Sequence, residues 1–146
     1  MNLLNWGILG LFIGTFLSAT IIPFPSEALV LGAYAIDIPF CQVLLIASMG
    51  NFLGSCTNYL IGFKTDPNYI QKKLKIRTDK FELWSLRIQK YGLVIGLLVW
   101  LPIIGEVLTI LLGFFRVSFL RLSLFMLIGI VLRYVVVLYL YSLSIQ

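Results

Sequence analysis

The chain has 146 residues, of which 60% are hydrophobic and 12% are charged, and its mean hydropathy is +1.02. Ordinary soluble domains carry about a quarter charged residues, and a soluble domain of this length has too little interior for so many apolar side chains. The composition therefore excludes a water-soluble globule and favours lipid as the solvent. The sequence contains no histidine, which removes Ser-His-Asp and Cys-His mechanisms and the commonest metal ligand. We expect no enzymatic activity, no metal site and no cofactor.

The net charge of +5 is concentrated in one segment. Residues 1–63 contain no Lys or Arg, whereas residues 64–90 contain eight basic and three acidic residues. A basic loop between apolar segments is expected on the cytoplasmic side of a membrane. We therefore predict a cytoplasmic linker at 64–90, and no nucleic-acid partner. The apolar N-terminal run lacks a basic flank and a small-residue cleavage site, so a removed signal peptide is not expected.

The first apolar segment, residues 2–22, is long enough to enter a bilayer but ends at Pro23-Phe24-Pro25-Ser26-Glu27. Residues 28–36 then provide about 13 Å of helix, less than half of a hydrocarbon core of about 30 Å. This length predicts a re-entrant hairpin, in which the chain turns at the prolines and returns to the face that it entered from. Asp37-Ile38-Pro39 predicts a turn, and residues 40–63 are long enough for a full span.

The second half repeats this order. Residues 91–101 are apolar, Pro102–Glu106 interrupts them, residues 107–115 return, and residues 119–143 are long enough to span. At an offset of 79 residues, seven identical pairs occur: Pro23 and Pro102, Glu27 and Glu106, Leu29 and Leu108, Phe40 and Phe119, Leu45 and Leu124, Gly50 and Gly129, Leu53 and Leu132. The sequence thus predicts one membrane domain over 1–146, with repeat one at 3–63 and repeat two at 91–143.

Each repeat would cross the membrane an odd number of times, so the repeats should be inverted. With the linker inside, Arg116 and Arg121 fall on the cytoplasmic side and Asp37 falls outside, as the positive-inside rule expects. Broken helices in corresponding positions of inverted halves indicate a transporter-type site near the midplane. The alternative is four plain helices that are kinked at their proline motifs, against which the short return segments argue.

An amphipathic helix is expected within the linker. Asp79-Lys80-Phe81-Glu82 matches a capping box, and four side chains share the face that follows, namely Phe81, Trp84, Ile88 and Tyr91. Basic residues surround this face, so the helix should lie in the cytoplasmic interface and contact anionic lipid head groups. The expected fold class is an all-α integral membrane protein with an inverted repeat of two re-entrant helical hairpins. Each hairpin is followed by a transmembrane helix, and one interfacial amphipathic helix is added.

The few charges within the apolar segments are candidate functional residues. Glu27 and Glu106 each fall in the first turn of a half-helix, where exposed N–H groups and the helix dipole favour a carboxylate, and Ser26 is a candidate cap. Arg133 lies about fourteen residues into the last span, too deep to reach water easily, so Glu27 or Glu106 is its expected partner. The alternatives are a glutamate that only caps its helix and an ion pair that is only structural.

Other candidates lie at the membrane boundary and on the first span. Arg116 and Arg121 serve either as interface anchors or as an access point for a lipid phosphate. One face of the first span carries Asn51, Ser55, Asn58 and Gly62, and it should point inward as a packing surface or as a polar lining for a head group. The structural breaks are assigned to Pro23, Pro25, Pro102 and Gly105. The cysteines Cys41 and Cys56 have no CxxC spacing, and we interpret them as small core residues.

Several motifs occur in a defined order: Pro23-Phe24-Pro25-Ser26-Glu27, Gly50-Asn51-Phe52-Leu53-Gly54, Trp100 to Glu106, Gly113-Phe114-Phe115-Arg116, and Gly129 with Arg133-Tyr134. Together they resemble the DedA, or VTT-domain, superfamily of membrane proteins and its YqaA-like branch. The resemblance implies facing re-entrant hairpins, with functional residues that correspond to Glu27, Glu106, Arg116 and Arg133. It also implies links to undecaprenyl phosphate recycling and proton-dependent membrane homeostasis in bacteria, and to phospholipid scrambling in eukaryotic relatives.

The expected function is translocation or scrambling of a lipid-linked anion, such as undecaprenyl phosphate or a phospholipid, by a multi-pass protein of the bacterial inner membrane. The arginines would pair with the phosphate, and Glu27 and Glu106 would gate by proton exchange. Two alternatives stay open: a proton-coupled carrier of a small ion or metabolite, and a non-transport assembly or homeostasis factor. The expected partners are membrane lipids, an anionic lipid or lipid-phosphate substrate, protons, and a second copy in a homodimer.

Overall fold

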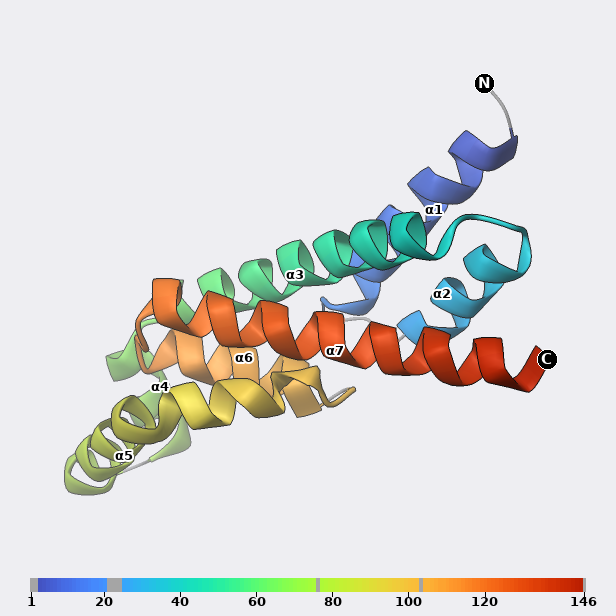
Figure 1. Cartoon of the computed structure of the whole chain (residues 1–146). Coiled ribbons are helices and arrows are strands. Elements are labelled where there is room, and N and C mark those ends of the chain that lie inside the picture. Colours follow the sequence, from blue (N-terminus) through green and yellow to red (C-terminus); the bar gives the residue numbers. More distant parts are fainter. Residues whose placement is uncertain (1–2, 21–24, 76, 103, 146) are drawn as a thin grey trace. The chain divides into compact units, whose positions relative to one another are not determined.

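A computed structural model of the chain describes residues 3–20, 25–75, 77–102 and 104–145. Their elements, labelled in Figure 1, are α1 (Leu3–Ser18), α2 (Ser26–Ala35), α3 (Phe40–Lys64), α4 (Pro67–Leu74), α5 (Thr78–Gly96), the 3-10 helix η1 (Leu97–Trp100), α6 (Ile104–Phe114) and α7 (Phe119–Ile145). No strand occurs among these described residues, and the prediction of an all-α fold is confirmed. The break predicted at Pro23 lies outside the described residues.

Two helices, α3 and α7, are long and apolar enough to cross a membrane. With 25 and 27 residues, they are about 38 and 40 Å long at 1.5 Å per residue, more than a hydrocarbon core of about 30 Å. Both helices keep large apolar side chains exposed, and on α7 these recur every fourth residue at Leu120, Leu124, Ile128, Leu132, Val136 and Leu140. A continuous apolar stripe of this kind is typical of a surface that contacts lipid.

The chain divides into two compact units. Unit 1 comprises residues 1–55 and 127–146, and unit 2 comprises residues 56–126. Each long helix therefore contributes to both units. Unit 1 contains α1, α2, the first part of α3 and the last part of α7, whereas unit 2 contains the rest of α3 and α7 together with α4, α5, η1 and α6.

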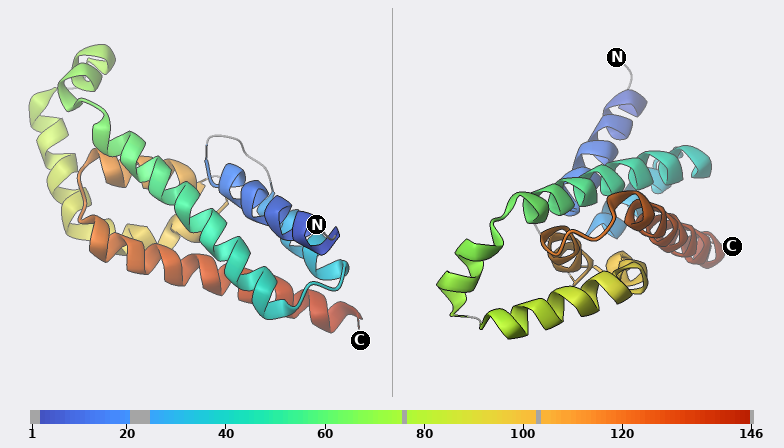
Figure 2. Two further views of the ribbon diagram at one scale, coloured as in Figure 1. Left: turned by 90° about the horizontal axis from the view of Figure 1, so that it is seen from above. Right: turned by 90° about the vertical axis from the view of Figure 1, so that its left-hand side faces the viewer.

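Unit 1 is built around the hairpin of α1 and α2, which lie side by side in Figures 1 and 2. Its buried core combines residues of all four helical segments: Leu11, Val30, Ala33, Ile38, Val43, Ala47, Ile130, Tyr134 and Leu138. Gly50 brings α3 close to α1, because a Cβ at this position would meet the backbone carbonyl of Phe12 and the hydroxyl of Thr15.

Unit 2 places α6 against the C-terminal part of α3 through two glycines. A Cβ at Gly62 would meet the carbonyl oxygen of Ile110, and a Cβ at Gly113 would meet the carbonyl oxygen of Tyr59. The Tyr59 hydroxyl donates a hydrogen bond to the Val117 carbonyl at 2.6 Å. The backbones of α3 and α6 therefore approach closely in a way that only glycine permits at these positions.

The linker contains one more helix than its sequence predicts. It contains α4, which begins where the Asp66 carboxylate accepts a hydrogen bond from the Asn68 N–H at 2.9 Å and Pro67 occupies the first turn. The predicted capping box at Asp79 is wrong, because α5 begins at Thr78 and Asp79 instead pairs with Arg77 at 3.0 Å.

Helix α5 also runs past the predicted end of the linker. The expected amphipathic helix and the first limb of the second hairpin form one helix to Gly96, because nothing between Tyr91 and Gly96 breaks it. The predicted apolar face is divided. Phe81 packs against Phe114 and Phe115, while Trp84 and Tyr91 stay exposed.

Helix α1 ends at Ser18, where a hydrogen bond from the Ser18 hydroxyl to the Thr15 carbonyl closes its last turn. One further expectation is corrected. Cys41 is exposed and Cys56 is partly buried. The interpretation of Cys41 as a core residue is wrong, because the buried face of α3 begins at Val43 and Ala47 and Cys41 faces away from it.

The turns that precede α3 and α7 have the same local structure. Asp37 and Arg116 adopt left-handed backbone angles, with φ of 64° and 54°, which is uncommon for residues other than glycine. The turns share two backbone hydrogen bonds, from Asp37 to Tyr34 and Ile38 to Ala33 in one, and from Arg116 to Gly113 and Val117 to Leu112 in the other. Every equivalent pair is 79 residues apart, the offset of the sequence identities.

Candidate functional site

Arg133 lies near the middle of α7, roughly 20 Å from either end at 1.5 Å per residue. Its side chain is 11% exposed. In the middle of a helix that is long and apolar enough to cross a membrane, a guanidinium group is expected to find its partners inside the protein or in a ligand.

Glu27 supplies that partner in unit 1. The distance from Arg133 Nη2 to Glu27 Oε1 is 3.3 Å, and the glutamate side chain is 28% exposed. The same nitrogen donates a hydrogen bond to the Ser26 hydroxyl at 2.6 Å. The predicted role of Ser26 as a side-chain cap is wrong, because Pro25 occupies the N-cap and Ser26 accepts from Arg133. The guanidinium group thus lies at the N-terminus of α2.

Tyr134 and Asn51 extend this group of polar contacts. The Arg133 guanidinium lies 5.0 Å from the centre of the Tyr134 ring, and the buried Tyr134 hydroxyl accepts a hydrogen bond from Asn51 Nδ2 at 3.0 Å. We call Ser26, Glu27, Asn51, Arg133 and Tyr134 the Arg133 cluster. It joins α2, α3 and α7 within unit 1.

The polar face of α3 is buried along its length. Asn51, Ser55 and Asn58 are 6%, 5% and 1% exposed, so the face points inward as predicted. Ser48, which the sequence analysis did not single out, continues the same face one turn earlier and is also buried. Its spacing from Asn51 was the signal that could have identified it.

Unit 2 holds the remaining candidate residues. Glu106 lies in the first turn of α6, as Glu27 does in α2, and is partly buried. Arg116 and Arg121 are exposed, and the Arg116 guanidinium lies 5.1 Å from the centre of the Phe63 ring. Gly54 occupies the position 79 residues before Arg133. The two repeats therefore have equivalent glutamates, Glu27 and Glu106, whereas the second repeat alone has an arginine at the position of Arg133.

The residues assigned to helix breaks, Pro25, Pro102 and Gly105, differ in their physical role. Pro25 has an extended backbone at the start of α2, and exposed Pro102 lies between η1 and α6. Gly105 is buried, and a Cβ there would meet the Val99 carbonyl oxygen. Glycine at this position therefore lets η1 pack tightly on α6.

Tyr134 is the member of the cluster whose role the sequence analysis missed. It lies on the buried face of α7 with Met126, Ile130 and Leu138, each four residues apart and 0–1% exposed. A tyrosine hydroxyl on a buried apolar face requires a hydrogen-bond partner, and that requirement was the available signal.

Two long apolar helices with exposed apolar stripes, together with helix breaks and an ion pair at mid-helix, define the class as α-helical membrane proteins. The chain belongs to the VTT-domain family, whose model matches residues 22–143. This match confirms the resemblance to the DedA superfamily.

Curated relatives agree with this assignment. An uncharacterized protein of Haemophilus influenzae is 35% identical over 140 residues, which cover 89% of this chain and 84% of the relative. The inner membrane protein YqaA of Escherichia coli K12 is 34% identical over 131 residues, which cover 89% of this chain and 87% of the relative. The protein of the same name from Shigella flexneri matches equally. No solved structure matches the chain.

Proposed function

We propose that this chain is a multi-pass protein of the bacterial inner membrane that translocates or scrambles a lipid-linked anion, such as undecaprenyl phosphate or a phospholipid. The observation that carries the proposal is the pairing of mid-helix Arg133 with Glu27 at the start of a short helix. The relatives named inner membrane protein YqaA support the location.

The Arg133 cluster has the chemistry to exchange one anion for another. A guanidinium group binds phosphate as well as carboxylate, and the N-terminus of α2 favours negative charge. A lipid phosphate that reaches Arg133 would displace the Glu27 carboxylate, which would then take up a proton. Translocation would thus be proton-dependent, because Glu27 must lose that proton to pair with Arg133 again.

The proposed topology is an inverted repeat. The hairpins before α3 and α7 would be re-entrant from opposite faces, with the Asp37 turn outside and the Arg116 turn and linker 64–90 inside. Glu106 would serve the opposite leaflet, and exposed Arg116 and Arg121 would attract lipid phosphates. The basic residues of α4 and α5 would contact anionic lipids, and a homodimer would cover part of the exposed apolar surface.

Lipid translocation in proteoliposomes tests the proposal. Glu27→Gln and Arg133→Ala should each lower the rate for a labelled anionic lipid at least tenfold, since each removes one side of the exchange. Glu82→Gln removes an exposed carboxylate on α5 and should leave the rate unchanged. All variants are compared after size-exclusion chromatography has selected folded protein.

Wild-type rates in both cluster variants would overturn the proposal. Flux of a soluble solute without lipid movement would instead favour a proton-coupled carrier. Growth rescue of a deletion strain by both variants, with no translocation by the wild type, would favour an assembly or homeostasis factor.

A further inference from the structure

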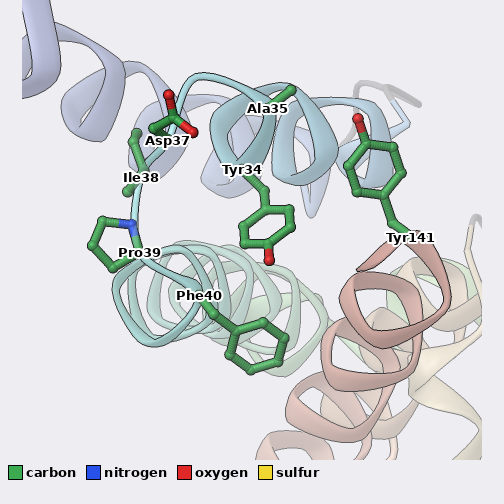
Figure 3. Close-up of a pocket in the computed structure, with 7 residues that line it drawn as sticks. All are labelled: Tyr34, Ala35, Asp37, Ile38, Pro39, Phe40 and Tyr141. Carbon is green, nitrogen blue, oxygen red and sulfur yellow. The ribbon is translucent and has the colours of Figure 1, made fainter. Parts of the chain in front are cut away.

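A second site in unit 1 lies away from the Arg133 cluster. An open pocket of about 530 Å³ is bordered by the turn between α2 and α3 and by the C-terminal part of α7 (Figure 3). Its lining residues are Tyr34, Ala35, Asp37, Ile38, Pro39, Phe40 and Tyr141. None of these residues belongs to the Arg133 cluster.

Three aromatic rings from three helices line this space, and Figure 3 shows the Tyr34 ring between those of Phe40 and Tyr141. The centre of the Tyr34 ring lies 6.3 Å from that of Phe40 and 6.1 Å from that of Tyr141, at interplanar angles of 87° and 75°. Aromatic faces carry negative potential and attract cations, most strongly where several rings surround one cation.

Asp37 adds a full negative charge at this pocket. The charged side chains of unit 1 are Glu27, Asp37 and Arg133, and Arg133 pairs with Glu27. The Asp37 charge is therefore not balanced by a basic side chain of its own unit. Its left-handed backbone, with φ of 64°, and the hydrogen bond from its N–H to the Tyr34 carbonyl hold it at the turn.

We propose that this pocket binds the ammonium group of a phospholipid head group, with Asp37 supplying the charge and Tyr34, Phe40 and Tyr141 supplying the aromatic surface. The pocket lies where α3, a candidate membrane span, begins at Phe40, so a membrane-spanning α3 would place it at the depth of lipid head groups. Tyrosines also anchor proteins at this depth, but such anchoring requires no carboxylate. The site is separate from the proposed transport at Glu27 and Arg133, and its test does not depend on that activity.

Binding of a short-chain phosphatidylethanolamine to the purified full-length protein in detergent tests the site. The wild type should bind it about tenfold more tightly than short-chain phosphatidylglycerol, which has no amine. Asp37→Asn should remove this preference. Asparagine also tolerates a left-handed backbone, so the variant removes the charge while the turn is kept. Glu82→Gln serves as the matched charge control and should keep the preference.

A second pair of variants tests the aromatic surface. Tyr141→Leu should weaken phosphatidylethanolamine binding several-fold, whereas Tyr139→Leu, which changes an exposed tyrosine two residues away, should not. An unchanged preference in both Asp37→Asn and Tyr141→Leu would overturn the site. Free ethanolamine that binds as tightly as the lipid would overturn the assignment to a head group, because the ligand would then be a soluble amine.

Discussion

The Arg133 cluster combines a charged pair and a neutral pair in one partly buried network. Arg133 meets Glu27 and Ser26, while Tyr134 joins the guanidinium to Asn51. Buried polar groups are costly when they lose a partner, so each member should stabilise the fold as well as serve the proposed function. The Tyr134 hydroxyl also accepts a longer hydrogen bond from Arg133 Nη2, at 3.5 Å. Stability and transport are therefore separated by measuring unfolding and translocation in the same variants.

Tyr134→Phe should lower the free energy of unfolding by about 1–2 kcal/mol, because it leaves the buried Asn51 amide without its acceptor. Asn51→Ala should have a similar effect, and the double variant should cost less than the sum of the two. Thermal unfolding of all three in detergent gives this coupling energy. Tyr139→Phe, on an exposed face of the same helix, is the control. Strictly additive losses would contradict the proposed coupling.

Arg133→Ala should destabilise the fold by about 2 kcal/mol, because it leaves the partly buried Glu27 carboxylate at the start of α2 without its guanidinium. Combining Glu27→Gln with Arg133→Ala should recover part of this loss, since the remaining group is then neutral. The measurement is the unfolding midpoint of the single and double variants. A double variant less stable than Arg133→Ala alone would show that charge compensation is not the reason.

The sequence made part of this cluster predictable. The rarity of charge within apolar segments identified Glu27 and Arg133, and helical depth predicted their pairing. The contact of Ser26 with Arg133 was not predictable, because it depends on how residues more than a hundred positions apart meet in space.

At the scale of elements, close helix contacts depend on glycine. In unit 2, Gly62 and Gly113 bring α3 and α6 together with backbone atoms in the space that a side chain would need. In contrast, Gly10 on α1 and Gly32 on α2 have no atom within 4 Å of a Cβ built there. These two pairs of glycines therefore predict opposite effects of the same substitution.

Gly62→Ala and Gly113→Ala should each lower stability by about 1–3 kcal/mol, because the added methyl group forces the helices apart. Gly10→Ala and Gly32→Ala should raise stability by about 0.5–1 kcal/mol through helix propensity. Thermal unfolding in detergent measures all four. A similar effect at all four positions would indicate that propensity, rather than packing, decides the outcome.

The helices were predictable where strong local signals exist. Proline motifs located the breaks, and the Asp37 turn and the apolar lengths located α3 and α7. The change from polar to apolar composition near Tyr91 did not predict that α5 continues from Thr78 to Gly96. A helix can pass from a polar to an apolar environment without any local signal in its sequence. The start of α4 was predictable in principle, because Asp66 at the N-cap followed by Pro67 is a helix start signal.

At the scale of the whole molecule, the repeated turns allow a test of topology. Cys41 lies just after the Asp37 turn, and Ser118 follows Arg116 in the equivalent turn; both residues are exposed. In spheroplasts, a membrane-impermeant maleimide should label Cys41 in a Cys56→Ala background. Ser118→Cys, in a background without the native cysteines, should react only after permeabilisation. Labelling of both positions from the same side would exclude an inverted repeat.

The division of the chain into units has a consequence for synthesis. Unit 2 is continuous in sequence, whereas unit 1 combines residues 1–55 with residues 127–146. A growing chain can therefore complete unit 2 while unit 1 still lacks its last helical segment, the C-terminal part of α7. Until residues 127–146 emerge, Glu27 has no Arg133, and a chain that stops after Met126 would retain an incomplete first unit. Quality-control proteases should recognise such truncated chains, because residues 1–55 pack with residues 127–146, which a truncated chain lacks.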